Sequence, residues 1–300
     1  MRLVRVIACV VAAVSLTSLA HGAAVPTVVA RIPVSVSIQP CAAAAGGRFV
    51  WVSAYASPVL LKIDPRRNAV VGRTPIGFGS CGLGLGAGAL WIEDTTSSTV
   101  SRVSVRTGKR VAAIPVGSTP YDATFAYGSA WATSYGSGEV SQISPARNRV
   151  VRRFPMSQAY GLVGAFGSIW ATGSDGVIRI DPVAGAVTAR IPLAGGGGWT
   201  AASPDAVWVT TGAGVVRIDP EANAVAATVP IAGPLGDPAV VGDRLWVPQI
   251  RRNRIVLVDT ATNALAGSVK AGIGPFVVTE IRGEAWVPSW KGNDVWRFRP

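Results

Sequence analysis

Seven tryptophan residues recur along the chain at an almost constant interval, and this repeat constrains the fold more than any other feature. They are Trp51, Trp91, Trp131, Trp170, Trp208, Trp246 and Trp286, spaced 40, 40, 39, 38, 38 and 40 residues apart. The segments between them alternate apolar and polar residues, are rich in valine and isoleucine, and are interrupted by glycine and proline. A period near 40 residues with this alternation is typical of β-propeller blades, whereas a helical solenoid needs a 3.6-residue periodicity.

A five-residue turn recurs once in six of the repeats. It spans residues 64–68, 104–108, 144–148, 181–185, 219–223 and 259–263, begins with Asp or Ser, and ends with Asn or Gly. The first residue can accept hydrogen bonds from nearby backbone N–H groups, and the last tolerates a positive φ. We therefore expect a hairpin turn between the third and fourth strands of each blade. Structural roles in this turn are expected for Asp64, Asp181, Asp219 and Asp259.

The seventh repeat is incomplete, because residues 294–300 reach only the third strand. The missing fourth strand is found at the other end of the chain, where residues 27–34 align with residues 69–76 of the first repeat. We therefore predict an all-β, seven-bladed β-propeller with four-stranded antiparallel blades. The N-terminal strand is expected to complete the last blade and close the ring, which pairs two otherwise free strand edges.

The first 24 residues have the composition of an export signal. Arg2 and Arg5 precede an apolar run over residues 6–20, and small residues follow up to Ala24. This pattern predicts a signal peptide at residues 1–24, cleaved after Gly22 or Ala24, and a single propeller domain at residues 25–300. A membrane anchor is the alternative, although the apolar run is short for a span. We expect a periplasmic or extracellular monomer without a transmembrane segment after cleavage.

The chain is strongly basic, with a formal net charge of +12. Basic residues gather in the third-to-fourth-strand turns and outer strands of the first three repeats, a set that we call the basic arc: Arg66, Arg67, Arg73, Arg106, Lys109, Arg110, Arg147, Arg149, Arg152 and Arg153. Such a surface suits a polyanion, such as single-stranded DNA or an acidic glycan. The alternative interpretation is that these charges protect exposed edge strands and keep the protein soluble.

The cysteine and histidine content limits which disulfides, catalytic sites and metal sites are possible. Cys41 and Cys81 each lie ten residues before a repeat tryptophan, at matched positions in adjacent blades beside the central channel, and in an exported protein this favours a disulfide. The single histidine, His21, lies in the predicted signal peptide. Mature protein would therefore lack the histidine of Ser–His–Asp and Cys–His catalysis and of many metal sites. We expect no catalytic residue, metal or cofactor, with Ca²⁺ or Mg²⁺ held by carboxylates as the alternative.

Two sets of loops are expected to meet around the channel on one face of the propeller. One set joins successive blades and the other joins the second and third strands within a blade. The candidate ligand-binding residues on them are Tyr55, Glu93, Asp94, Tyr121, Asp122, Tyr135, Tyr160, Asp175, Trp199, Asp237, Arg251, Arg252, Phe276, Trp290 and Lys291. Aromatic side chains beside Arg and Lys suit stacking against bases or sugars. For Tyr121, Tyr160 and Phe276 we expect packing in the channel mouth, with ligand contact as the alternative, whereas Trp199 and Trp290 interrupt polar or glycine-rich loops and are better ligand candidates.

The repeat resembles that of the YVTN-type bacterial β-propellers. Residues 208–211 (Trp-Val-Thr-Thr), 131–134 and 170–173 are similar to the motif that names the group, with Trp in place of Tyr. Residues 217–220 (Arg-Ile-Asp-Pro) and 114–117 (Ile-Pro-Val-Gly) are similar to its later part. The resemblance covers nearly the whole predicted mature chain. It implies seven blades and binding roles, which include single-stranded DNA binding in some members.

Two groups of propeller enzymes show a weaker resemblance. Virginiamycin B lyases are similar in repeat and use histidines with a glutamate and magnesium, but this chain has no histidine after position 21. Lactonase propellers hold calcium with channel carboxylates and amides, for which Glu93, Asp122, Asp175 and Asp237 are candidates. We expect an exported, non-catalytic scaffold that binds a ligand or protein partner. The alternatives are a lyase- or lactonase-like enzyme that uses channel carboxylates and a divalent cation, and nucleic-acid or acidic-glycan binding by the basic surface.

Overall fold

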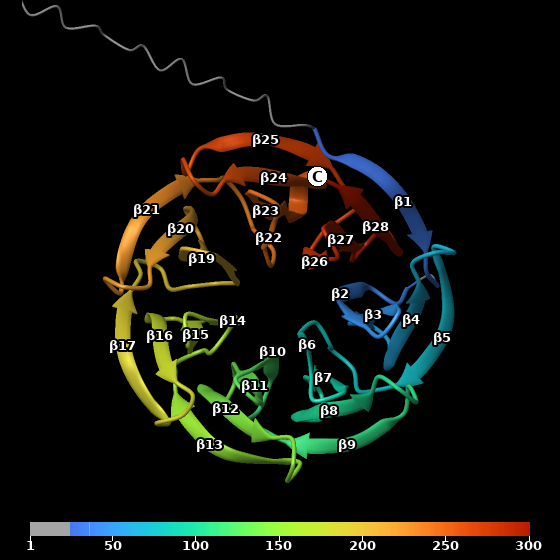
Figure 1. The fold of residues 1–300 in the computed structure, drawn as a ribbon, viewed down its shortest axis with the longest axis horizontal. Helices are drawn as coiled ribbons and strands as arrows, with labels where there is room; N and C mark the ends of the chain where they lie inside the picture. Colours follow the sequence, from blue (N-terminus) through green and yellow to red (C-terminus); the bar gives the residue numbers. More distant parts are fainter. Residues whose placement is uncertain (1–24, 36) are drawn as a thin grey trace, which may run out of the picture.

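The structure is a ring of seven four-stranded antiparallel sheets, which confirms the predicted propeller (Figure 1). It is a computed structural model that describes residues 25–300 except residue 36. The first strand of each blade lies nearest the centre of the ring, and the fourth lies at its periphery (Figure 1). Across the described residues the one helical element is the short 3-10 helix η1 (Ile250–Arg252).

The strands follow the chain around the ring, blade by blade. Blades 1 to 3 comprise β2 (Pro40–Gly46), β3 (Phe49–Ala54), β4 (Val59–Asp64) and β5 (Ala69–Pro75); β6 (Leu83–Gly86), β7 (Ala89–Asp94), β8 (Thr99–Ser104) and β9 (Arg110–Pro115); and β10 (Pro120–Ala126), β11 (Ser129–Ser134), β12 (Glu139–Ser144) and β13 (Arg149–Pro155). Blades 4 and 5 comprise β14 (Leu162–Ala165), β15 (Ser168–Gly173), β16 (Gly176–Asp181) and β17 (Ala186–Pro192); and β18 (Thr200–Ser203), β19 (Ala206–Thr211), β20 (Gly214–Asp219) and β21 (Ala224–Pro230). Blades 6 and 7 comprise β22 (Ala239–Val241), β23 (Arg244–Gln249), β24 (Arg254–Asp259) and β25 (Leu265–Lys270); and β26 (Thr279–Ile281), β27 (Glu284–Ser289), β28 (Asp294–Arg299) and β1 (Thr27–Pro33).

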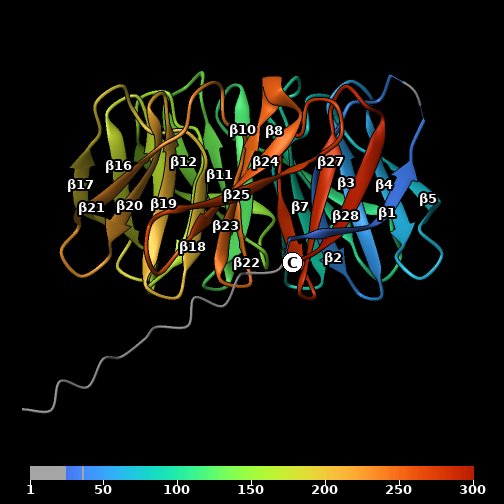
Figure 2. The same ribbon diagram turned by 90° about the horizontal axis from the view of Figure 1, so that it is seen from above.

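The antiparallel strands give the ring two distinct faces. We call upper the face that holds the connections between blades and the turns between second and third strands. The lower face holds the other turns and the C-terminus, which is marked at the lower edge of the ring in Figure 2. Predicted ligand-binding loops therefore all belong to the upper face.

The seven repeat tryptophans are buried between blades, where they form the centres of the core clusters. Trp51 of blade 1, for example, packs with Leu90 and Ile92 of blade 2. None of the seven is more than 1% exposed. Each blade therefore buries its apolar side chains against its neighbours, and the stability of one blade depends on the next.

An arginine links three of these tryptophans to the following blade. In blade 4, Arg179 lies over the ring of Trp170, with its guanidinium carbon 4.8 Å from the ring centroid. Its Nη1 donates to Pro220 O at 2.7 Å and to Asn223 Oδ1 at 3.0 Å, both in the turn before the outermost strand of blade 5. Asn223 has a φ of 51°, as predicted for the last residue of that turn. Equivalent contacts are made by Arg102 in blade 2 and Arg297 in blade 7.

Replacing Arg179 with methionine should weaken this contact between blades. The Arg179→Met side chain keeps an apolar stem on Trp170 but removes the charged donors, which should lower the free energy of unfolding by about 1.5–3 kcal/mol. Arg190→Met is the matched control, because Arg190 is an exposed residue of β17 whose side chain makes no hydrogen bond or ion pair with another described residue. Equilibrium denaturation of both variants measures the difference, and equal losses would contradict the assigned role.

The N-terminal strand completes the seventh blade, as predicted. β1 pairs antiparallel with β28, with Val28 opposite Phe298 and Ile32 opposite Val295. Ile32 is fully buried in a core cluster that also contains Trp286 of blade 7 and Val52 of blade 1. The two ends of the described chain therefore share one sheet, and this sheet closes the ring (Figure 1).

Ile32→Ala should destabilise the closed ring by roughly 2–5 kcal/mol, because it leaves a cavity beneath the closing strand. Val28→Ala in the same strand serves as the control, since Val28 is 44% exposed and its truncation should change stability by about 0.5 kcal/mol or less. Chemical denaturation would show the difference. A small effect of Ile32→Ala would mean that β1 contributes little to closure.

The predicted signal peptide at residues 1–24 lies outside the described residues, so cleavage and export stay predictions. In the part of the chain that the structure describes, no helix has the length and apolar character needed to cross a membrane.

Candidate functional site

Seven aromatic side chains on the upper face form one continuous cluster, which we call the aromatic cluster: Tyr55, Tyr121, Tyr135, Tyr160, Trp199, Phe276 and Trp290. Neighbouring rings are in contact along the series: the distance between ring centroids is 5.2 Å for Tyr55 and Trp290, 4.8 Å for Trp290 and Phe276, and 5.4 Å for Phe276 and Trp199. The series continues from Trp199 to Tyr160 at 4.7 Å and from Tyr160 to Tyr121 at 4.5 Å. Tyr135 completes it, 6.0 Å from Tyr121. All seven were predicted members of the ligand-binding face.

The cluster has a buried centre and an exposed rim. Trp199 and Phe276 precede their innermost strands and are only 2% and 8% exposed, although they lie at the mouth of the channel. Tyr55 and Tyr135 come from turns between second and third strands and are 40% and 37% exposed. The centre therefore closes the channel at the upper face, and the rim offers aromatic surface to a ligand. Trp199, expected as a ligand candidate, is largely buried in this centre, and its role as a ligand-binding residue stays a prediction.

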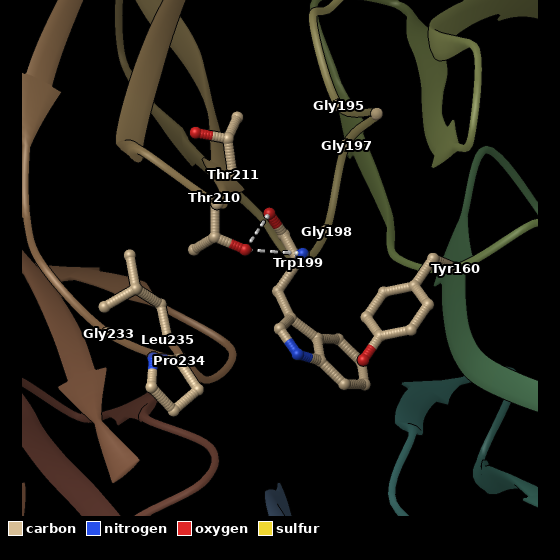
Figure 3. Close-up of a pocket in the computed structure, with 12 residues that line it drawn as sticks. Tyr160, Gly195, Gly197, Gly198, Trp199, Thr210, Thr211, Gly233, Pro234 and Leu235 are labelled. Carbon is tan, nitrogen blue, oxygen red and sulfur yellow. Dashed lines mark hydrogen bonds between the residues drawn. The ribbon is translucent and has the colours of Figure 1, made fainter. Parts of the chain in front are cut away.

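In blades 1, 3, 4 and 5, a side-chain hydroxyl of the second strand holds the start of the innermost strand in place. The residue two positions after the repeat tryptophan accepts from the innermost strand: Ser53 from Ala42 N at 3.1 Å, Thr133 from Asp122 N at 3.0 Å, and Thr172 from Gly161 N at 2.9 Å. Thr210 accepts from Trp199 N at 2.8 Å (Figure 3). The hydroxyls of Thr133, Thr172 and Thr210 therefore hold the backbone at or next to Tyr121, Tyr160 and Trp199 of the cluster.

Cys41 and Cys81 form a disulfide under the aromatic cluster, with a Cα–Cα distance of 5.0 Å. The bond joins the innermost strand of blade 1 to the start of that of blade 2. Both cysteines are buried in the same apolar cluster as Trp199 and Phe276. Closing a loop of 40 residues restricts the unfolded chain by roughly 4 kcal/mol on the chain-entropy model.

An open pocket of about 240 Å³ lies beside the aromatic cluster, between blades 4, 5 and 6 (Figure 3). Tyr160 and Trp199 form one side, and Thr210, Thr211 and residues 233–235 form the other. The wall between them is the run of four glycines at 195–198, where Gly195 and Gly196 have φ values of 80° and 77°. In the sequence this run stands out only as the glycine-rich loop that Trp199 interrupts. A glycine-rich connection next to an aromatic residue was the available signal for a pocket.

Two of the three predicted basic residues share a second upper-face pocket, of about 230 Å³. It is lined by Arg251, Lys291, Asn253, Ile250, Ile273 and Gly274. Lys291 directly follows Trp290 in the chain. Arg252 instead lines a separate depression with Gln249 and Arg254. Arg251 and Lys291 thus place positive charge at the edge of the aromatic cluster.

Glu93 and Asp94 do not lie in the ligand-binding loops, which corrects the prediction. They are the last two residues of β7 and are fully buried. Asp94 accepts hydrogen bonds from Gly77 N at 2.8 Å and from Ser101 Oγ at 2.5 Å, so it stabilises the connection between blades 1 and 2. Glu93 lies two residues after Trp91, at the position that carries the hydroxyl in other blades. Its carboxylate accepts hydrogen bonds from the N–H groups of Cys81 and Gly82.

Asp122 and Asp237 line a cavity of about 190 Å³ in the central channel, which we call the channel cavity. Asp122 accepts from Ala123 N at 2.7 Å and from Leu162 N at 2.9 Å. Burial raises the pKa of Asp122 to about 7. Burial also raises the pKa of Glu93 and of Asp237 well above their ordinary values, and the charge of Asp122 adds to both shifts. These three carboxyl groups therefore influence one another inside the ring.

The fourth predicted channel acid, Asp175, is exposed and accepts a hydrogen bond from Ser174 Oγ at 3.1 Å. The turn that carries it belongs to the upper face, and it does not line the channel cavity. Among the residues that the structure describes, no three His, Cys, Asp or Glu side chains are grouped closely enough to hold a metal ion. The carboxylates thus do not converge in the manner that the lactonase resemblance implied.

The channel acids predict that stability falls as pH rises from about 4 to above 7. In this range the folded protein retains a proton on Asp122 that the unfolded chain releases, so each step in pH favours unfolding. Asp122→Asn should flatten this part of the stability curve. Thermal unfolding from pH 4 to pH 8 is the measurement.

Asp175→Asn is the control for that experiment, because Asp175 is an exposed acid outside the channel. Its pH profile should match the unmodified protein. An Asp122→Asn profile as steep as that of the unmodified protein would show that Asp122 is not protonated in the folded state.

No protein-family model and no curated protein matches this chain. Its fold is similar to solved structures, among them hydrazine synthase from Kuenenia stuttgartiensis, with a TM-score of 0.71, 16% identity, and coverage of 89% of this chain and 97% of that one. BamB from Moraxella catarrhalis gives a TM-score of 0.67, 13% identity, and coverage of 92% and 98%. The computationally designed protein Ika8 gives 0.69, 10% identity, and coverage of 87% and 83%. At these identities the similarity shows the propeller fold alone, and the YVTN repeat type stays a prediction.

Proposed function

We propose that this protein is an exported, non-catalytic binding scaffold and that its upper face is the binding surface. The observation that carries the proposal is the exposed rim of the aromatic cluster beside two open pockets. Four of the five tyrosines in the chain belong to this cluster, so the concentration of aromatic residues is local. Aromatic side chains supply large contact areas at small cost in side-chain entropy, which is why they are enriched in binding surfaces.

The ligand that fits this face presents flat rings next to negative charge. Ring faces would stack on Tyr55, Tyr135 and Trp290, as bases and sugars do on aromatic side chains. Arg251 and Lys291 lie beside that surface and would meet phosphate or carboxylate groups. A single-stranded nucleic acid or an acidic oligosaccharide has this chemistry, and so does an acidic protein segment that contains aromatic residues.

The non-catalytic part of the proposal rests on the sequence, in which the one histidine is His21. The fold does not decide the matter, because it is shared with a structure named hydrazine synthase and with a designed protein. The enzyme alternative would use channel carboxylates with Ca²⁺ or Mg²⁺. It differs in a measurable way, because it requires a divalent ion to bind the native protein.

The basic arc supports a second candidate function, polyanion binding at the outer strands. All ten of its members are exposed. Some of them already have structural partners: Arg153 pairs with Glu139 at 3.0 Å, and Arg152 donates to Pro182 O at 3.2 Å. The arc is therefore partly engaged within the protein, and we rank it below the upper face.

Thermal unfolding with a panel of ligands separates these functions. The panel contains single-stranded DNA, acidic oligosaccharides, Ca²⁺ and Mg²⁺, each at two salt concentrations. A ligand of the upper face at 100 times its Kd should stabilise the protein by about 2.7 kcal/mol, which is roughly 5–10 °C in the midpoint. Tyr55→Ala and Trp290→Ala should abolish most of this shift.

Tyr127→Ala is the matched control, because Tyr127 is 45% exposed but lies in a turn of the lower face. It should leave the shift unchanged. If the upper-face variants respond as the unmodified protein does, the proposal is wrong. A salt-sensitive shift lost only on replacing Arg66, Arg67 and Arg110 would favour the basic arc, and a shift with a divalent ion would favour the enzyme alternative.

A further inference from the structure

The channel cavity is a well that is closed above and open below. Its upper end is formed by Cys81, Gly82 and Val277, directly under the buried centre of the aromatic cluster. Its lower end is formed by Thr124, Thr279 and Glu280, of which Glu280 is exposed. These residues lie toward the lower-face ends of the innermost strands, so the well opens on the face opposite to the proposed binding surface.

Two polar side chains in this well are available to a ligand. The hydroxyl of Thr200, a residue that is 7% exposed and lines the well, has no hydrogen bond to any described residue. Asp237 also lines the well and is half-buried there. Buried polar groups in folded proteins are normally paired, because an unpaired one loses its hydrogen bonds to water without a replacement. Both groups are thus positioned to contact a bound molecule.

The well is lined by acidic side chains, inside a protein that is positive overall. Asp122 and Asp237 line it, the Glu93 carboxyl lies immediately behind Cys81 and Gly82, and no Lys or Arg is among its lining residues. Because the net charge of the chain is +12, this concentration of acid is local. No basic side chain of the protein neutralises these acids within the well, so a positively charged ligand could do so.

The walls favour an organic cation over a bare metal ion. Apolar side chains fill the spaces between the acids, namely Ala42, Leu83, Leu162, Val277 and Val278. Among the described residues the acids form no group of three metal-ligating side chains. The volume of about 190 Å³ is below the roughly 300–1,000 Å³ of pockets for drug-sized ligands, which indicates a small molecule.

We propose that the channel cavity binds a small organic ammonium ion, which enters from the lower face. Its charged nitrogen donates to Asp122, Asp237 and Thr200, and its short apolar part packs on the alanine, leucine and valine side chains. This site is separate from the upper-face surface, and neither proposal depends on the other.

The test uses n-butylammonium as the probe and n-butanol as a neutral analogue of nearly the same shape. Isothermal titration at pH 8 and constant ionic strength should show saturable butylammonium binding and no butanol binding. Asp237→Asn should weaken binding at least tenfold, and Thr200→Val, which keeps the side-chain shape, should weaken it several-fold. Asp175→Asn and Trp290→Ala should leave it unchanged, because both residues belong to the upper face.

Several results would overturn the proposal: no butylammonium binding, equal binding of butanol, or binding that Asp237→Asn does not affect. Binding of Ca²⁺ in place of butylammonium would also overturn it and would identify a metal site. Circular dichroism confirms the folding of each variant, and Thr200→Val provides an independent test if Asp237→Asn does not fold. Loss of the upper-face shift in Trp290→Ala with intact butylammonium binding would distinguish the two proposals.

Discussion

The packing of each blade against the next is the interaction on which the rest of the structure depends. A single four-stranded blade cannot bury both of its faces, so its tryptophan is covered by side chains of the adjacent blade. Arg102, Arg179 and Arg297 add directed bonds to this apolar contact, because each covers its own tryptophan and donates to a turn in the following blade. The ring thus combines non-directional burial with a few bonds that fix the angle between neighbours.

This packing also determines where functional groups can lie. In four of the seven blades the second strand, held by its tryptophan, carries a hydroxyl that binds the start of the innermost strand. Innermost strands in turn place the aromatic cluster at the upper end of the channel and the carboxyl groups of Asp122 and Asp237 just below it. A shift of a few residues along an innermost strand therefore separates the aromatic surface of the upper face from the acidic well, which opens on the lower face.

The fold could be predicted from the sequence because its signal repeats, whereas the site depends on what differs between repeats. The tryptophan period, the Asp–Asn turn and the unpaired seventh repeat each recur or stand out against a recurring pattern. Glu93 was misplaced because it substitutes for a hydroxyl at one position of that pattern, and only its bonds to Cys81 and Gly82 reveal this. The burial of Trp199 and the pocket wall at residues 195–198 depend on how loops from three blades meet, which a linear repeat does not specify.

The sharing of one sheet by β1 and β28 has a consequence for how the chain is made. These strands lie at opposite ends of the described sequence, so their pairing carries nearly the largest loop-closure entropy available to this protein. Six blades can form from local hairpins while the chain is still being synthesised, but the seventh must wait for β28. A product truncated before β28 would keep two open sheet edges, so an intact β28 is a condition for closing the ring.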